Sequence, residues 1–352
     1  MPADFPITDR PVRFALVGCG RISANHIEAL RRHAGRAELV AVCDTDAAAL
    51  SRASATTGAP GFASLDSLIA GCDFDIAALC TPSGLHPRQA LQLAQAGRHV
   101  LSEKPMATKW DEGMAMVRGC RDAGVKLFVV KQNRLNATLQ RVREAIAQDR
   151  FGRIHMVVVN VFWTRPQSYY DESPWRGRWD MDGGAFMNQA SHYVDMVDWL
   201  VGPVDSVHAY TATQARAIEA EDSGVMSLRL RAGGMASINV TMLTHGQNFE
   251  GSLTILGERG TVRVGGVAVN RIEHWAFADS RPEDADVQAA NYAPASVYGY
   301  GHPLYYANVI DTLRGQAHAQ VDGYEGLRSL EVVIAAYRSA RDGVRVGLPL
   351  VF

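Results

Sequence analysis

The chain of 352 residues is long enough for two domains, because one hydrophobic core rarely serves more than about 250 to 300 residues. Its formal net charge of -2 argues against a general affinity for nucleic acid or anionic membranes. Five cysteines without a CxxC pair or zinc-like Cys/His spacing favour a reducing compartment and no metal site. Without a leader-like N-terminus or a run of about 18 apolar residues, we expect a cytoplasmic protein without a membrane span.

Short β-branched runs alternate with helical patterns between Val12 and Val130, which is typical of a parallel sheet built from βαβ units. Each apolar run ends in Gly, Asp, Pro or Lys, at the sheet edge where α/β proteins bind ligands. The strands are expected at 14–20, 37–44, 74–82, 97–105 and 125–133. This alternation predicts a Rossmann domain over residues 1–131.

The first strand runs into VGCGRISANH, whose Gly18 and Gly20 supply the GxG of a dinucleotide fingerprint. Glycine permits the tight turn and brings a pyrophosphate to the helix N-terminus, where N–H groups and the helix dipole favour anions. Ser23 stands where a third glycine is expected, so a plain strand-to-helix turn is the alternative. The turn, with Arg21 and Ile22, is predicted to bind a nicotinamide dinucleotide.

Asp44 ends the second strand, about where the ribose-binding acid of this fingerprint falls. A carboxylate there accepts a hydrogen bond from the ribose 2′-OH but repels a 2′-phosphate. Asp44 therefore predicts NAD rather than NADP as cofactor. The alternative is that Asp44 only caps the next helix.

The third ligand edge is CTPSGLHP, in which Pro82 and Gly84 indicate a turn. We expect Thr81, Pro82 and His86 to lie beside the nicotinamide half of NAD. For His86, a role in capping the loop is an equally good interpretation.

The fourth edge, HVLSEKPMATK, holds Lys104 rigidly because Pro105 stops the strand and fixes the backbone. Beside NAD, its ammonium is placed to hydrogen-bond a substrate hydroxyl and stabilise negative charge on that oxygen. Glu103 is expected to orient Lys104 or to be its ion-pair partner at the cofactor edge. The alternative is an ordinary solvated lysine.

The segment MDGGAFMNQASHYVDMVDWL contains His192, the candidate catalytic partner of Lys104. Asn188 lies four residues before it and shares its face if the helix already includes Asn188. Asp195, three residues later, is placed to hold the imidazole. A structural histidine is the alternative, since the segment also carries a helical apolar stripe at Val194, Val197 and Val201.

EKP after a strand, followed by a GG run and an HxxD helix, resembles the glucose-fructose oxidoreductase, inositol dehydrogenase and MocA family. The resemblance extends to AAYRSARDGVRVGLP near the C-terminus. It implies NAD and a C-terminal α/β domain whose open sheet mediates oligomers, here a homotetramer, with Lys104 and His192 as the catalytic pair. Many members carry DxGxH, whereas this chain has NQASH, so Asn188 replaces an aspartate and His192 is the expected base.

The second half is rich in strands that alternate apolar and polar residues between glycine turns. This pattern predicts a large, mostly antiparallel open sheet in an α/β domain over residues 132–352. Strands are expected at 153–164, 206–215, 223–231, 234–243, 250–258 and 260–266.

Between the first of these strands and His192 lies FWTRPQSYYDESPWRGRWDMDGG, a long segment rich in aromatics and arginines. Aromatic faces stack on sugars and bases, and arginine forks bind carboxylate or phosphate. A packed loop at an oligomer interface is the alternative. The predicted substrate-binding residues are Lys104, Arg165, Tyr169, Trp175, Arg178, Asn188, Gln189 and His192.

NVFWTRPQSYYDESPWRG, DGGAFMNQASHYVD and ASVYGYGHPLYYANV are similar to a subgroup of that family, the bacterial UDP-N-acetylglucosaminuronate 3-dehydrogenases. This resemblance implies oxidation of a UDP-linked amino-uronic acid at C3, in the synthesis of a diacetamido uronic acid of O-antigen. It also implies reoxidation of NADH by 2-oxoglutarate. The alternatives are a dehydrogenase of a free sugar or inositol, and a non-catalytic NAD-dependent sensor on the same fold.

Overall fold

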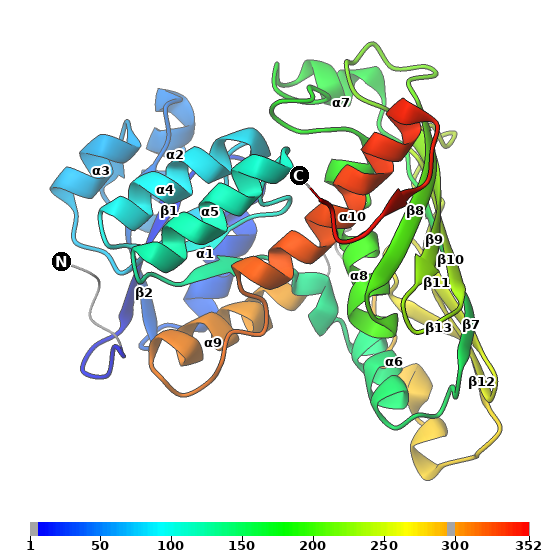
Figure 1. The fold of residues 1–352 in the computed structure, drawn as a ribbon. Helices are drawn as coiled ribbons and strands as arrows, with labels where there is room; N and C mark the ends of the chain where they lie inside the picture. The colour runs from blue at the N-terminus through cyan, green and yellow to red at the C-terminus, as the bar shows by residue number, and fades with distance from the viewer. Residues whose placement is uncertain (1–5, 294–299, 352) are drawn as a thin grey trace. The chain divides into compact units, whose positions relative to one another are not determined.

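The computed structural model describes residues 6–293 and 300–351. The chain divides into two compact units (Figure 1). The first contains residues up to Lys131 together with His302–Leu327, and the second contains Gln132–Gly301 and the chain from Arg328. The sequence-based division assigned all of 132–352 to one domain, whereas the structure returns residues 302–327 to the first unit. Part of the ASVYGYGHPLYYANV motif, residues 295–299, lies outside the described residues.

The first unit contains a six-stranded sheet in the order β3-β2-β1-β4-β5-β6, and every neighbouring pair is parallel. The order reverses between β1 and β4, and open α/β sheets bind their ligands at the carboxyl ends of the strands at such a point. The predicted Rossmann fold is confirmed. The strands are β1 (Val12–Val17), β2 (Ala37–Cys43), β3 (Gly61–Phe62), β4 (Ile76–Leu79), β5 (His99–Ser102) and β6 (Leu127–Val129).

Helices connect these strands and cover the sheet. Asp46 caps α2 by accepting a hydrogen bond from the Ala49 backbone N–H at 2.7 Å, and Gly58 ends the helix with a left-handed φ of 75°. The returning segment adds α9 to this unit. The helices are α1 (Ser23–Arg32), α2 (Ala47–Thr57), α3 (Leu65–Gly71), α4 (His86–Gln95), α5 (Trp110–Asp122) and α9 (Gly301–Leu313).

The second unit contains an eight-stranded sheet in the order β13-β12-β11-β7-β10-β9-β8-β14. Within the described part of the chain, only β7 and β10 of this sheet pair in parallel, so the expected mostly antiparallel sheet is confirmed. The strands β13 and β14 were not predicted. The strands are β7 (Ile154–Phe162), β8 (Val204–Ala212), β9 (Ser223–Leu230), β10 (Met235–Thr241), β11 (Glu250–Gly257), β12 (Gly260–Gly265), β13 (Arg271–Phe277) and β14 (Val346–Gly347).

One face of this sheet is covered by helices, with α6 and α8 alongside it in Figure 1. Alternate residues of β9 are buried and exposed, as expected for a sheet with one covered face. Among the described residues, no helix is both long and apolar enough to cross a membrane. The helical elements are α6 (Ala137–Ala147), α7 (Gln167–Asp171), the π-helical turn η3 (Ala185–Gln189), α8 (Ser191–Val201) and α10 (Gly323–Asp342), whose residues from Arg328 belong to this unit.

Candidate active site

The turn between β1 and α1 is built for close approach of a ligand. Gly18 has a φ of 94°, and an ideal Cβ on it would lie 2.7 Å from the backbone of Cys80, so only glycine fits. At Gly20 an ideal Cβ would meet no atom within 4 Å, so the space beside the turn is open. Helix α1 begins three residues later, at Ser23, so its N-terminus follows directly on this turn. The turn therefore fits a dinucleotide pyrophosphate.

Asp44 lies at the carboxyl end of β2, next to this turn. Its carboxylate accepts hydrogen bonds from the backbone N–H groups of Cys19 at 2.7 Å and Asp46 at 2.8 Å. The cap of α2 is Asp46, so the alternative in which Asp44 caps the next helix is wrong. The carboxylate is held beside Gly18 and Gly20, where a ribose hydroxyl donor is expected.

His86 links two of the predicted ligand edges. Its ring nitrogens lie 2.9 Å from the carbonyl oxygen of Thr81 and 3.1 Å from that of Pro105, and the ring is buried. Burial lowers the pKa of His86, although both hydrogen bonds oppose this shift. The ring therefore ties the loop after β4 to the loop after β5, which agrees with the loop-capping alternative for this residue. Thr81 also donates to Gln89 Oε1 at 2.6 Å.

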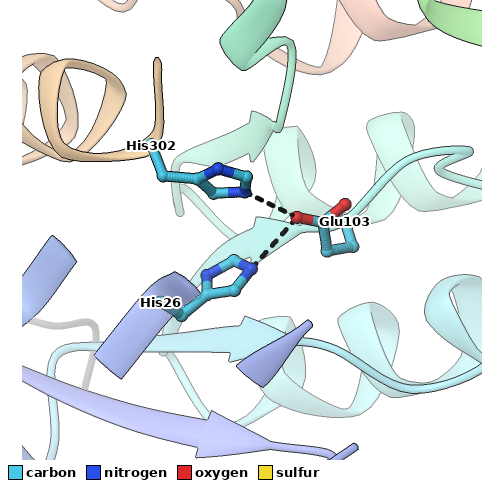
Figure 2. A group of neighbouring side chains, drawn as sticks. All are labelled: His26, Glu103 and His302. Carbon is cyan, nitrogen blue, oxygen red and sulfur yellow. Dashed lines mark hydrogen bonds and ion pairs between the residues drawn. The ribbon is translucent and has the colours of Figure 1, made fainter. Parts of the chain in front are cut away.

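Glu103 and Lys104 follow β5 at the predicted ligand edge. The Glu103 side chain, however, points into the interior of the first unit (Figure 2). Its Oε1 lies 3.0 Å from His26 Nε2 and 3.4 Å from His302 Nε2. Its Oε2 accepts a hydrogen bond from the backbone N–H of Lys104 at 3.1 Å. Glu103 thus anchors the backbone that carries Lys104 and is itself held by interior side chains rather than by the ligand edge.

In the second unit, three predicted substrate residues come together after β7. Arg165 donates hydrogen bonds to Gln189 Oε1 at 2.9 Å and Asn248 Oδ1 at 3.2 Å. Its guanidinium carbon lies 5.4 Å from the ring centre of Tyr169, whose hydroxyl accepts from Gln189 at 3.4 Å. A guanidinium has five N–H donors, so a bound carboxylate can share this group with Gln189 and Asn248.

The other predicted arginine lies apart from this group in its contacts. Arg178 is half exposed and makes a bidentate ion pair with Asp180, with both contacts at 3.0 Å. Trp175 contacts Arg176, whose guanidinium carbon also lies 4.3 Å from the Tyr169 ring centre. The structure therefore connects Trp175 to the Arg165 group through Arg176, and it gives Arg178 a separate ion pair.

Asn188 does not lie on the helix of His192. It belongs to the π-helical turn η3, and α8 begins only at Ser191, so the two side chains do not share the predicted helical face. The Asn188 side-chain amide donates to Asp182 Oδ1, and Asp182 Oδ2 accepts from the Gly177 backbone N–H at 2.9 Å. These contacts fix the turn that precedes His192.

His192 is buried, and its Nε2 lies 3.4 Å from the side-chain nitrogen of Gln132. An amide N–H facing this nitrogen implies that Nε2 is unprotonated, and its single lone pair, which a general base needs, then faces Gln132. Asp195, the residue expected to hold the imidazole, accepts hydrogen bonds from Arg134 on both of its oxygens, at 2.8 Å. This buried, bidentate pair holds α8 against the segment that contains Gln132.

Glu221 is a buried carboxyl beneath η3. Its Oε1 accepts from the Phe186 backbone N–H at 2.7 Å and from the Tyr337 hydroxyl at 2.9 Å. Burial raises the pKa of Glu221 to about 7. An ideal Cβ on Gly184 would lie 1.9 Å from Glu221 Oε2, which explains the second glycine of the GG run.

Sequence reasoning missed several residues that hold this site. Gln132 follows the sixth strand of the first sheet, so attention to polar residues at strand ends would have found it. Glu221 and Arg134 act on segments far from them in sequence and gave no local signal, whereas Asp182 lies close in sequence to its partners Gly177 and Asn188. Lys104 belongs to the first unit and His192 to the second, so their cooperation stays a prediction.

Family comparisons cover most of the chain. Residues 12–131 match the family model GFO_IDH_MocA, "Oxidoreductase family, NAD-binding Rossmann fold". Residues 143–348 match the family model GFO_IDH_MocA_C, "Oxidoreductase family, C-terminal alpha/beta domain". An inositol 2-dehydrogenase of Rhizobium meliloti (strain 1021) is 29% identical over 96% of this chain and 99% of its own length.

Two solved structures are more similar. The WlbA dehydrogenase of Bordetella pertussis, in complex with NADH and UDP-GlcNAcA, is 66% identical with a TM-score of 0.96, over 98% of this chain and all of that one. The WlbA dehydrogenase of Chromobacterium violaceum, with the same two ligands, is 60% identical with a TM-score of 0.95 over the whole of both chains.

Proposed function

Because the chain belongs to the Gfo/Idh/MocA oxidoreductase family, we propose that it oxidises the C3 hydroxyl of UDP-N-acetylglucosaminuronic acid, with NAD as hydride acceptor. The observation that carries this proposal is the whole-chain likeness to two dehydrogenases whose structures contain NADH and UDP-GlcNAcA. The product is the 3-keto sugar, an intermediate on the way to a diacetamido uronic acid of O-antigen.

The ligand edge of the first unit supports NAD as cofactor. The open side of Gly20 and the N-terminus of α1 would receive the pyrophosphate, together with Arg21 and Ile22. Asp44 would accept a ribose hydroxyl hydrogen bond, and Thr81 and Pro82 would border the nicotinamide. When bound, NAD accepts the hydride that leaves the sugar carbon.

His192 and Lys104 have different roles at the substrate hydroxyl. His192 Nε2 takes the hydroxyl proton when the substrate hydroxyl replaces the Gln132 amide at the single lone pair of this nitrogen. The Lys104 ammonium donates a hydrogen bond to the same oxygen and stabilises its negative charge while the carbonyl forms. Asn188 contributes through the η3 turn, where its side-chain amide donates to Asp182.

Arg165 supports the choice of a uronic acid over a neutral sugar. Its guanidinium is oriented by Gln189, Asn248 and the rings of Trp163 and Tyr169. Such an oriented fork suits the planar carboxylate at C6 of the sugar. Arg176 and Arg178 remain available to the pyrophosphate region in this proposal.

Three further parts of the proposal concern the setting of the reaction. The bound NADH is reoxidised by 2-oxoglutarate, which makes the protein independent of exchange with free NAD. The enzyme works in the cytoplasm, where nucleotide sugars are made. It has no nucleic-acid or membrane partner.

The outer face of the second sheet supports a homotetramer. The side chains of Met156, Tyr210, Val225 and Met235 are 39–68% exposed on four adjacent strands, β7, β8, β9 and β10. Large apolar side chains clustered in this way typically mark an interface. We expect light scattering to give the mass of four chains, and Tyr210→Glu to give smaller species.

The proposed activity is tested by incubating the purified protein with NAD and a panel of UDP-sugars, with and without 2-oxoglutarate. We expect mass spectrometry to find a 3-keto product from UDP-N-acetylglucosaminuronic acid only. Multiple turnovers are expected only when 2-oxoglutarate is present, together with formation of 2-hydroxyglutarate.

Free glucuronic acid, N-acetylglucosamine and inositol belong in the same panel as controls. Turnover of one of them without the nucleotide would replace the proposal with a free-sugar or inositol dehydrogenase. NAD binding without any turnover would favour a sensor.

A further inference from the structure

The interior of the first unit contains a buried cluster of one carboxylate and two imidazoles. Glu103, His26 and His302 are 6%, 0% and 3% exposed. In Figure 2 the two imidazoles approach the carboxylate from α1 and α9, and both point at Oε1. The second oxygen accepts the backbone N–H of Lys104. Three N–H groups from three segments therefore converge on one carboxylate.

The hydrogen-bond pattern shows how a negative charge is kept in this interior. Tyr306 lies 2.7 Å from His26 Nδ1, and burial raises the pKa of Tyr306 well above its usual value, so its hydroxyl stays protonated and donates. His26 then donates through Nε2 to Glu103 without carrying a charge. Burial acts to raise the pKa of Glu103, but the hydrogen bonds from His26 and His302 outweigh it and hold that pKa well below its usual value.

The cluster lies at a junction in the chain. His302 directly follows Gly301, the residue at which the chain leaves the second unit. Within that unit an ideal Cβ on Gly301 would lie only 2.0 Å from the carbonyl oxygen of Gln132, so the two backbones are in close contact. Gln132 in turn lies beside His192. Glu103 therefore bonds directly to the Lys104 backbone. Through His302 and the peptide bond to Gly301, it is also connected to the backbone of Gln132, the residue beside His192.

We propose that Glu103, held by His26 and His302, is a positioning residue that fixes the Lys104 backbone and, through the Gly301–His302 junction, the Gln132 segment beside His192. The kinetic part of this inference rests on the proposed function. Its contacts are made to protein groups, so Glu103 acts through its neighbours and not on the substrate.

A metal ion is the competing explanation, because the three ligand atoms lie within 4.8 Å of one another. Both Oε1···Nε2 separations, 3.0 and 3.4 Å, are accounted for by hydrogen bonds in which an imidazole N–H donates to a carboxylate. The hydroxyl of Tyr306 supplies the hydrogen bond that fixes the required tautomer of His26. The donors present therefore satisfy the carboxylate without a cation.

Glu103→Gln tests the anchor with little change in shape. Glutamine has one acceptor oxygen, so in either orientation its NH₂ group faces an N–H donor, from the imidazoles or from Lys104. His302→Asn removes one donor and leaves the carboxylate in place. His99→Asn is a matched control, because His99 is also buried on β5 and accepts the Lys126 backbone N–H at 3.0 Å, outside the cluster.

The first measurement is hydrogen exchange at the Lys104 amide, read by mass spectrometry with fragmentation on the full chain. We expect exchange at least tenfold faster in Glu103→Gln and His302→Asn than in wild type, and unchanged in His99→Asn. This measurement uses no substrate. If the wild type proves inert toward UDP-sugars while the exchange result holds, the proposed function fails and the anchor stands.

The second measurement is steady-state kinetics with the substrate that the sugar panel identifies. We expect kcat to fall ten- to a hundredfold in both cluster variants, while the affinity for NADH, measured by fluorescence titration, changes less than twofold. Deuterium at the oxidised carbon should slow kcat more in these variants than in wild type, because misplaced catalytic groups make hydride transfer rate-limiting. His99→Asn should lose thermal stability without this split.

Three results would overturn the inference. One is unchanged exchange at Lys104 in both cluster variants. Another is unchanged kcat, or a fall in kcat that His99→Asn reproduces at equal loss of stability. The third is one equivalent of zinc or another divalent metal in the purified wild type that is lost in His302→Asn, which would make the cluster a metal site.

Discussion

The two units hold their candidate ligand groups by different means. In the first, the groups stand at strand ends and contact backbone: Asp44 accepts N–H groups of Cys19 and Asp46, and Gly18 lies against the Cys80 peptide. In the second, side chains hold side chains within and around the segment from β7 to α8. The pairs are Arg165 with Gln189, Asn188 with Asp182, Asp195 with Arg134, and Glu221 with Tyr337.

This difference predicts how each region responds to substitution. Where the sheet backbone sets the position, loss of one side chain should remove one ligand contact and little else. Where side chains support one another, loss of one should disturb its partners, because a buried group left without its partner bears the cost of desolvation. Glu103 is the exception in the first unit, since its carboxylate is held by two side chains.

The largest effects should come from the catalytic residue of each unit. Lys104→Ala and His192→Asn are each expected to lower kcat by on the order of a hundredfold or more, because each removes a proton-transfer or charge-stabilising group. Affinity for NADH, measured by fluorescence titration, should be nearly unchanged in both. Rapid-quench measurement of the 3-keto product gives the rate of the chemical step.

The control for Lys104 is Lys109→Ala, in the same loop. Lys109 is exposed and pairs with Glu112 at 2.8 Å, so its loss should leave kcat as in wild type. Full activity in Lys104→Ala or His192→Asn would remove that residue from the mechanism, and a collapse of NADH binding would reassign it to the cofactor.

The second prediction concerns the pH dependence of stability through Glu221. Its folded pKa of about 7 lies above the usual 4.5, so the stabilising protonated form is fully present below pH 4.5 and is lost as pH rises through 7. The shift corresponds to roughly 3 kcal/mol. Glu221→Gln should therefore gain stability relative to wild type, by up to this amount, between pH 5 and pH 8 in urea or thermal unfolding.

Glu219→Gln is the matched control, because Glu219 is exposed two residues away. It should leave the pH dependence of stability as in wild type. A stability difference between wild type and Glu221→Gln that is constant from pH 5 to pH 8 would show that the Glu221 carboxyl is ionised throughout this range.

The same difference explains what could be predicted from the sequence. The positions of Gly18, Asp44 and Lys104 just after strands could be predicted because a strand end can be read from a local apolar run and the residue that stops it. The surroundings of His192 could not be predicted from the sequence. The π-helical turn η3 interrupts the helical period before His192, and Glu221 comes from a segment about thirty residues later. Side-chain pairs between distant segments leave no local pattern, and neither does the return of residues 302–327 to the first unit.

The third prediction separates the arginines of the second unit. Arg165→Ala should cost about 1.5 to 3 kcal/mol in binding a uronic acid, roughly ten- to a hundredfold in affinity, by loss of a charge-assisted hydrogen bond. Residual turnover of UDP-N-acetylglucosamine, which lacks the carboxylate, should be almost unaffected. Kinetics on both substrates measure this selectivity.

The comparison variants are Arg176→Ala and Arg178→Ala, whose described partners are Glu172 and Asp180. We expect them to affect both UDP-sugars equally, because the pyrophosphate is common to the two. Equal losses of affinity for both substrates in Arg165→Ala would show that Arg165 does not bind the sugar carboxylate. A wild type that prefers the neutral sugar would show that the substrate is not a uronic acid.

The smallest effect should come from Asp44, where the backbone sets the position. Asp44→Ala should weaken NAD by about 1.5 kcal/mol, roughly tenfold, through loss of one charge-assisted hydrogen bond to the ribose. It should also narrow the preference for NAD over NADP, because the carboxylate no longer repels a 2′-phosphate.

Asp46→Ala is the control variant, since it removes only the α2 cap. It should cost about 1 kcal/mol of folding stability and leave the affinity for NAD unchanged. Titration of both variants with NADH and NADPH decides the assignment: equal affinities of Asp44→Ala and wild type, or a wild type that prefers NADPH, would show that Asp44 only shapes the turn.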